Sequence, residues 1–440
     1  MSEVTSVREA SKPQIVFADA VRFWVLLGFI NFGGPAAQIA LMHRELVERR
    51  KWVGELTFGR GLGFCMALPG PEAQQLAIYL GWALHGVPGG IVAGTAFIGP
   101  SVVAMMLLTW LSVAHGDVEA VAGTLSGLQA VVVGILVDAV LRVGYRHLRS
   151  PVQLALATAS FAASAFLRLP FPVVVAVAAV AGVAASWLAP NWFHGPNPGT
   201  APQSDHTFPQ NPPTLKIRHH LRNVIGTTLV LWAIPVGGLA LWRGTDDILL
   251  EIALFFTRVS FFTFGGAYAV LSHVSDVVVN DYKWIDAARM VQGLGLAETT
   301  PGPLIMVTQF VGFSAAYSHA PRLSPLVAGV LGGLITTWCT FLPSFLFVLS
   351  GAPFVERLSA NPVIGAALAG ITSAVVGAIA TLTLHTTLHT IWPTGTTTDW
   401  FAVTVALVAL VALRKYSLPT YILAPIGAVA GALWTVISGV

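Results

Sequence analysis

The chain has 440 residues, of which 55% are hydrophobic and 10% are charged. Soluble domains carry about a quarter of their residues as charged side chains, so this composition excludes an ordinary soluble protein and indicates an integral membrane protein. The formal net charge is +3. The basic residues lie in short patches between apolar segments, which is typical of membrane topology signals and not of nucleic-acid binding.

Residues 1–19 form a polar N-terminal segment. They include acidic residues and lack the basic head, apolar run and small-residue cleavage site of a signal peptide, so we expect this segment to remain in the cytoplasm. The only cysteines, Cys65 and Cys339, lie in apolar surroundings. We interpret both as small core residues, not as a disulfide.

The first membrane region, residues 20–188, contains two interruptions of apolar sequence. The first is "NFGG" at residues 31–34, and the second is "PGP" at residues 69–71. Pro69 must end a helix that arrives at Leu68, because proline lacks an N–H group and clashes with the preceding turn, whereas Pro71 can begin a new helix. We predict broken helices or re-entrant hairpins at both places.

The same pattern returns in the second membrane region, residues 247–440. Residues 255–304 align without gaps on residues 23–72, and the identities concentrate at Gly, Pro, Phe and Trp. "TFGG" at residues 263–266 and "PGP" at residues 301–303 match the two interruptions, and Pro343-Ser344 matches Pro100-Ser101 farther along. The chain therefore contains two related repeats.

Two segments separate the repeats. Residues 189–221 are rich in Pro, Asn and Gly and cannot bury a core, which is typical of a solvated linker. Residues 222–243 are an apolar segment without a counterpart in the first repeat, and we expect a linking transmembrane helix there.

The basic residues predict that the repeats are inverted. "HRELVERRKW" in the first repeat carries four Lys or Arg residues, while the aligned "SDVVVNDYKW" carries Lys283 alone. Cytoplasmic loops collect Lys and Arg, so the two aligned loops are expected on opposite sides of the membrane. The predicted fold is an all-α polytopic protein with two inverted-topology repeats, a cytoplasmic N-terminus and a C-terminus on the opposite, periplasmic side.

Broken helices at membrane depth predict a polar cavity, because unpaired backbone groups are costly in lipid. The helices that begin after the breaks direct free N–H groups and the positive ends of helix dipoles at that cavity, which is a chemistry that suits an oxyanion. The expected substrate-binding residues at the four breaks are Gly33, Gly34, Pro69, Gly70, Pro71, Gly265, Gly266, Pro301, Gly302 and Pro303.

Several polar side chains near the breaks are candidates for the same site. Asn31 and Thr263 precede the two Gly-Gly pairs, and Gln74 and Gln309 follow the two Pro-Gly-Pro motifs. Arg258 lies within two turns of the second Gly-Gly pair, where a cation needs a cavity, a partner or the membrane interface. Glu298, three residues before Pro301, is expected to pair with Arg258 or to carry a coupling proton. Asp138 and Arg142 are expected to form a local pair one helical turn apart.

The combination "FGGP…RRKW…LPGPEAQ" and "FGGA…YKW…TTPGPL" resembles the two domains of the long-chain chromate transporter family over nearly the whole chain. The resemblance implies a carrier in the bacterial inner membrane that exports chromate, coupled to protons or to the membrane potential. Glu72 and Ala267-Tyr268 depart from the family pattern, in which small or hydroxyl residues and Gly-His are usual. A changed substrate or an altered coupling is compatible with these departures, and Glu72 is a second candidate for coupling.

Alternatives remain open at this point. Sulfate or another oxyanion shares the size and charge of chromate, and an intramembrane enzyme would also need a polar cavity, although no catalytic cluster or ATPase motif is visible. His385 and His389 share a helix face but lack a third ligand, so we expect no metal and no cofactor. The expected partners are the oxyanion and the lipid bilayer, and a homodimer is compatible with the sequence.

Overall fold

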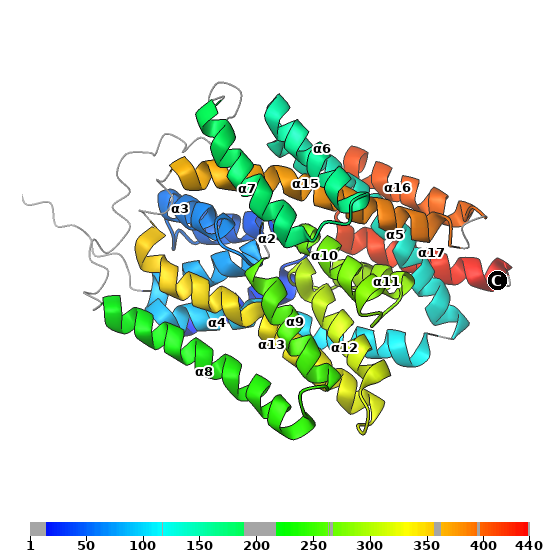
Figure 1. Cartoon of the computed structure of the whole chain (residues 1–440), viewed down its shortest axis with the longest axis horizontal. Helices are drawn as coiled ribbons and strands as arrows, with labels where there is room; N and C mark the ends of the chain where they lie inside the picture. Colours follow the sequence, from blue (N-terminus) through cyan, green and yellow to red (C-terminus); the bar gives the residue numbers. More distant parts are fainter. Residues whose placement is uncertain are drawn as a thin grey trace, which may run out of the picture.

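A computed structural model describes residues 15–116, 118–188, 217–262, 264, 267–355, 362–393 and 397–438. In these ranges the chain forms helices and connecting turns, without β-strands (Figure 1). Seven of the described helices are long and apolar enough to cross a membrane. The prediction of an all-α, multi-pass membrane protein is confirmed.

The first repeat consists of short and long helices. They are α1 (Phe17–Ile30), α2 (Gly34–His43), η1 (Arg44–Arg49), α3 (Glu55–Met66), α4 (Glu72–His115), α5 (Glu119–His147), α6 (Pro151–Ala165) and α7 (Phe171–Leu188). Helix α4 turns back on itself at His85 and Gly86, whose backbone angles are not helical. The part of α4 that precedes this turn is therefore a short hairpin arm, and the part that follows is a long helix.

The second repeat shows the same succession after the linking helix α8 (Ile217–Arg243). Its elements are α9 (Ile248–Phe261), α10 (Ala267–Asp276), η2 (Val277–Asp281), α11 (Ala287–Thr299), η3 (Leu304–Met306), α12 (Val307–His319), α13 (Pro325–Gly351), η4 (Ala352–Phe354), α15 (Pro362–Ile391), α16 (Trp400–Tyr416) and α17 (Thr420–Ser438).

Aligned residues adopt the same local structure in the two repeats. Both η1 and η2 are π-helical turns, and each is followed by a lysine with positive φ, 54° at Lys51 and 53° at Lys283. The central glycines of the Pro-Gly-Pro motifs also have positive φ, 134° at Gly70 and 118° at Gly302. Glycine adopts such angles without strain, so the repeated glycines reflect a repeated backbone path.

The predicted helix breaks are confirmed where the structure describes them. Helix α1 ends at Ile30 and α2 begins at Gly34, while α3 ends at Met66 and α4 begins at Glu72. Pro71 precedes the first helical residue instead of being that residue, because its ψ of 104° is extended. In the second repeat α11 ends at Thr299, and a short 3₁₀ turn leads into α12. Thr263, Gly265 and Gly266 lie outside the described residues.

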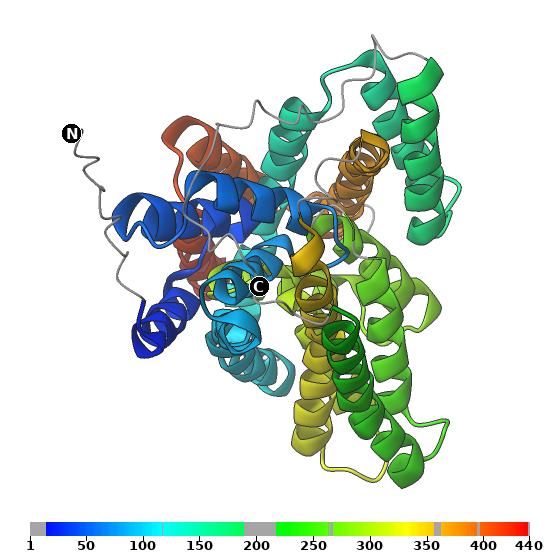
Figure 2. The same ribbon diagram turned by 90° about the vertical axis from the view of Figure 1, so that its left-hand side faces the viewer.

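Helices from the two repeats pack closely through glycines. A Cβ added at Gly127 of α5 would clash with the backbone of Gly427 in α17, and one added at Gly134 would clash with that of Ala406 in α16. Small residues allow this close approach in membrane proteins. Helix α5 thus lies among helices of the second repeat, and the blue N-terminal and red C-terminal helices are neighbours (Figure 2).

Helix α8 lies at the edge of the bundle (Figure 1). Among its residues only Val236 is buried, which suits a helix that faces lipid over most of its surface. Two hydrogen bonds attach its middle to the second repeat: the indole of Trp232 donates to the hydroxyl of Thr257, and the indole of Trp338 donates to the carbonyl of Leu231.

Candidate functional site

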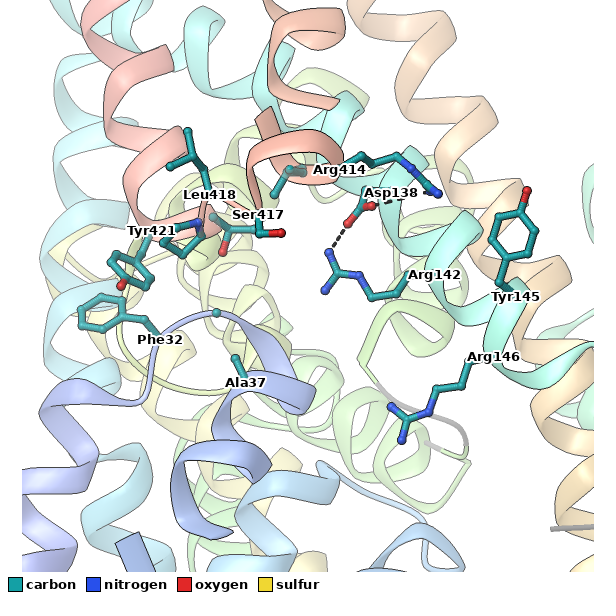
Figure 3. Close-up of a pocket in the computed structure, with 14 residues that line it drawn as sticks. Phe32, Ala37, Asp138, Arg142, Tyr145, Arg146, Arg414, Ser417, Leu418 and Tyr421 are labelled. Carbon is teal, nitrogen blue, oxygen red and sulfur yellow. Dashed lines mark hydrogen bonds and ion pairs between the residues drawn. The ribbon is translucent and has the colours of Figure 1, made fainter. Parts of the chain in front are cut away.

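A cavity of about 690 Å³ lies where the first helix break meets the ends of α5 and α16 and the start of α17 (Figure 3). It combines residues of both repeats. Its walls are formed by Phe32, Gly33, Ala37, Asp138, Arg142, Tyr145, Arg146, Leu413, Arg414, Ser417, Leu418, Pro419, Thr420 and Tyr421.

Three arginines give the cavity its charge. Arg142 and Arg146 project from successive turns of α5, and Arg414 projects from the last turn of α16. The carboxylate of Asp138 is the only acidic group among the lining residues, so the formal charge of the lining is +2. Such a cavity attracts anions, and a divalent anion would neutralise it.

Asp138 is held by two of these arginines. It forms an ion pair with Arg142 on its own helix, and Nη1 of Arg414 lies 3.9 Å from its other oxygen. The Asp138 side chain is 7% exposed, whereas those of Arg142 and Arg414 are 60% and 43% exposed. The predicted Asp138–Arg142 pair is confirmed, and the second partner, from the other repeat, was not predicted.

Two helices begin at the wall of the cavity. Helix α2 starts after Gly33, whose φ is 93°, and α17 starts at Thr420. A Cβ added at Gly34 would meet nothing within 4 Å, so the backbone at the break borders open space. Free N–H groups at a helix start favour oxyanions, and the two starts act in the same sense as the arginines.

The second Pro-Gly-Pro turn lies directly behind the first helix break. The backbone N–H of Gly302 donates to the carbonyl of Asn31 at 3.2 Å. Nε2 of Gln38 donates to the carbonyls of both Gly302, at 2.7 Å, and Asn31, at 2.8 Å, and Nδ2 of Asn31 donates to the carbonyl of Phe97. The structure therefore brings Asn31, Gly33 and Gly34 close to residues 301–303. Gln38 and Gly302, which are joined by one of these hydrogen bonds, are 264 positions apart in the chain.

The glycines of the two Pro-Gly-Pro turns pack against serines of the opposite repeat. A Cβ at Gly302 would lie 2.6 Å from the hydroxyl of Ser101, and one at Gly70 would lie 2.7 Å from the hydroxyl of Ser344. Both serines follow a proline within a long helix. Serine side chains thus lie where a Cβ on either glycine would stand, so the absence of a Cβ allows the repeats to pack closely at both turns.

Buried amide side chains surround these turns. Gln74 and Gln309 are fully buried. Nε2 of Gln309 donates to the carbonyl of Val102 at 2.9 Å, which links α12 to α4. Among the described residues neither amide atom of Gln74 has a hydrogen-bond partner, and neither does Oε1 of Gln309.

Glu298 and Arg258 are not paired. Glu298 is buried, and its carboxylate accepts a hydrogen bond of 2.7 Å from the hydroxyl of Tyr268. Arg258 is exposed, and its charge acts on Tyr282 near the loop that follows η2. The burial of Glu298 and the exposure of Arg258 separate the two groups that the sequence suggested as a pair.

Glu72 lies half-buried at the start of α4. Sequence analysis did not select Arg146 or Arg414 as site residues. The four-residue spacing of Asp138, Arg142 and Arg146 was visible and places all three on one helix face. No local signal identified Arg414, whose position depends on how α16 packs against α5.

The described residues contain no group of three or more His, Cys, Asp or Glu side chains that could hold a metal ion. The cavity combines positively charged side chains, two helix starts and aromatic rings. The ring centroids of Phe32 and Tyr421 are 5.3 Å apart.

Comparison with known proteins identifies the family. The family model described as "Chromate transporter" matches residues 18–183 and 250–432, which is one match for each repeat. The chain belongs to the chromate transporter family. Residues 184–249, which include α8, lie between the two matched ranges.

Relatives support the same assignment. A "Probable chromate transport protein" of Synechococcus elongatus is 28% identical over 433 residues, covering 96% of each chain. The "Chromate transport protein" of Cupriavidus metallidurans is 29% identical over 374 residues, covering 83% of this chain and 82% of the relative. The "Uncharacterized transporter YwrB" of Bacillus subtilis is 37% identical over 123 residues, 27% of this chain and 62% of the relative. No solved structure matches the chain.

Proposed function

We propose that this protein is a secondary active transporter that exports chromate across the bacterial inner membrane, driven by the proton gradient or the membrane potential. The family and the names of the relatives support chromate as cargo. The relatives are named as transport proteins, which favours transport over an intramembrane enzyme.

The observation that carries the proposal is the cavity at the first helix break. Chromate is a tetrahedral dianion, and a lining charge of +2 matches it. Guanidinium groups bind oxyanions through charge-assisted hydrogen bonds, and the starts of α2 and α17 add N–H donors. In this proposal Asn31, Gly33 and Gly34 contribute from the break, while Arg142, Arg146 and Arg414 hold the anion.

The direction of transport is proposed from the end of the bundle on which the cavity lies. His220, near the start of α8, contacts the carbonyl of Leu349, and Gly90 of α4 packs against Leu349. From Gly90, α4 continues to His115 at the opposite end of the bundle, and α5 leads back to His147. The cavity, at the end of α5, therefore lies at the same end of the bundle as the basic start of α8. Basic segments favour the cytoplasm, so we propose that chromate enters the cavity from the cytoplasm.

The same contacts support inverted repeats. Arg243, at the far end of α8, bonds the carbonyl of Pro321, which precedes α13. This contact supports a start of the second repeat at the end of the bundle opposite to the start of the first. We propose that the helix breaks of both repeats meet near the middle of the membrane and that one repeat moves against the other during transport.

Coupling is proposed to involve Glu298 and Glu72. Glu298 is buried three residues before the second Pro-Gly-Pro turn and accepts a hydrogen bond from Tyr268. The membrane potential alone also favours export, by about 2.3 kcal/mol per charge for each 100 mV when the inside is negative.

Transport into inside-out membrane vesicles tests the proposal. Radiolabelled chromate should accumulate in vesicles that contain the protein, should respond to an imposed pH gradient or potential, and should not accumulate in vesicles without it. Sulfate is added as a competitor, because it shares the charge and shape of chromate. If only sulfate is transported, the protein is an oxyanion transporter and the proposal of chromate as its substrate is wrong. If neither anion is transported, the proposal fails.

A further inference from the structure

We propose that Asp138 is a built-in competitor of the transported anion. Its carboxylate pairs with Arg142 and Arg414, and the oxyanion must displace it from at least one of them. The proposal rests on the proposed function, because it assumes that a divalent oxyanion binds in this cavity. It adds a residue that controls how tightly the anion is held and how fast it leaves.

The geometry of the ion pairs supports this role. Asp138 lies in the wall with its side chain 7% exposed, while the side chains of Arg142 and Arg414, which also line the cavity, are 60% and 43% exposed (Figure 3). An entering anion can therefore reach the arginines from the open side while Asp138 holds them from the buried side. Carboxylate and oxyanion would share the same N–H donors.

The position of Asp138 also connects the two repeats. Asp138 and Arg142 belong to α5 of the first repeat, and Arg414 belongs to α16 of the second. The Arg414 contact, at 3.9 Å, is the looser of the two pairs, and it is the one that crosses between repeats. An anion that takes over Arg414 would release this connection while the Arg142 pair on the same helix persists.

Other charged groups near Asp138 are accounted for. Arg146 lines the same cavity without an ion pair to Asp138 among the described residues, so it stays available to the anion. Glu298 and Tyr268 do not line the cavity and are hydrogen-bonded to each other. Within the described part of the chain Glu298 forms no ion pair with the arginines of the cavity, and Asp138 is the acidic residue there that pairs with Arg414.

The test compares Asp138→Asn with wild type in purified full-length protein. Binding of sodium chromate is measured by equilibrium dialysis with labelled anion, and transport is measured in vesicles. Asp138→Asn keeps the shape of the side chain and removes the competing charge, so we expect a Kd for chromate about tenfold lower. The free-energy difference that corresponds to this change in Kd is of the order of the interaction between nearby charges in a partly solvated site. The maximal transport rate should fall, because the carboxylate no longer helps to expel the anion.

Three controls make the result specific. Glu119→Gln removes the same charge from an exposed position at the start of α5 and should leave Kd unchanged. Asp138→Glu keeps the carboxylate and should retain affinity close to wild type. Asp138→Ser also removes the charge and replaces the Asn variant if that variant is not recovered folded.

The outcomes separate this proposal from the proposed function. If wild type binds neither chromate nor sulfate saturably, the proposed function fails and this inference falls with it. If wild type binds chromate and Asp138→Asn binds it equally or more weakly, the proposed function stands and the competitor role of Asp138 is overturned, because the carboxylate then only positions the arginines.

Discussion

At the level of single residues, two glycines in similar motifs have different surroundings. Gly34 and Gly302 both stand in helix breaks and both have positive φ, 76° and 118°. Gly34 borders open space, whereas Gly302 packs against Ser101 of the other repeat. Sequence motifs identified both backbone breaks, but the different surroundings of the glycines depend on the packing of distant helices.

The contact between Gly302 and Ser101 gives a prediction about stability. Gly302→Ala should destabilise the protein by about 2 kcal/mol or more, because alanine strains a positive φ and its Cβ would clash with Ser101. Adding Ser101→Gly removes the clash but not the strain, so the double variant should be more stable than the sum of the single effects implies. Thermal unfolding of the four proteins in one detergent measures this coupling. Additive effects would show that the contact is unimportant.

A second residue-level prediction concerns coupling through Glu298. Glu298→Gln keeps an oxygen that can accept from Tyr268 and removes the charge. If Glu298 carries the coupling proton, the variant should bind chromate as well as wild type does, and its uptake should no longer respond to a pH gradient. Binding and gradient-driven uptake are measured on the same preparation. A variant that responds normally to the gradient would remove Glu298 from the coupling mechanism.

At the level of elements, the sequence predicted most breaks but not the turn within α4. Proline and glycine pairs identified the breaks at residues 31–34, 69–71 and 301–303, because these residues restrict the backbone wherever they occur. The turn at His85 and Gly86 depends on one glycine with φ 65° and ψ −155°, a region that other residues avoid. A single glycine is a weak signal in an apolar segment, since glycine is frequent in membrane helices.

This turn can be tested by substitution. Gly86→Ala should destabilise the protein by about 1–3 kcal/mol through backbone strain alone, since a Cβ there would meet no atom within 4 Å. The matched control is Gly59→Ala in α3, which also meets nothing but lies in helical backbone and should be neutral or stabilising. Thermal unfolding compares the two. Equal effects would contradict the strained turn.

At the level of the whole molecule, the charges of aligned loops predict opposite orientations. Position 49 lies in η1 and position 281 in η2, in the same π-helical turn of each repeat. Single cysteines at these positions, in a background where the buried Cys65 and Cys339 are replaced by alanine, should react with an impermeant reagent from opposite sides of the membrane. Labelling from the same side would exclude inverted repeats.

The cavity itself shows why sequence alone reached only part of the site. Asn31, Gly33 and Gly34 were predicted because their motif is local. Arg414 lines the cavity because α16 packs against α5, and Arg146 lines it because the end of α5 lies near the first helix break. The positions of Arg146 and Arg414 in the cavity depend on contacts between helices that are far apart in the chain.

The most direct test of the account is chromate uptake by proteoliposomes that contain either wild type or the double variant Arg146→Gln, Arg414→Gln. This variant removes two positive charges from the cavity and keeps the pair between Arg142 and the buried Asp138 intact. Arg22→Gln, at an exposed position in α1, serves as the control. We predict saturable uptake by wild type and by the control, and at least about tenfold less by the double variant at unchanged unfolding temperature. Uptake by the double variant equal to that of wild type would contradict the assignment of this cavity as the oxyanion site.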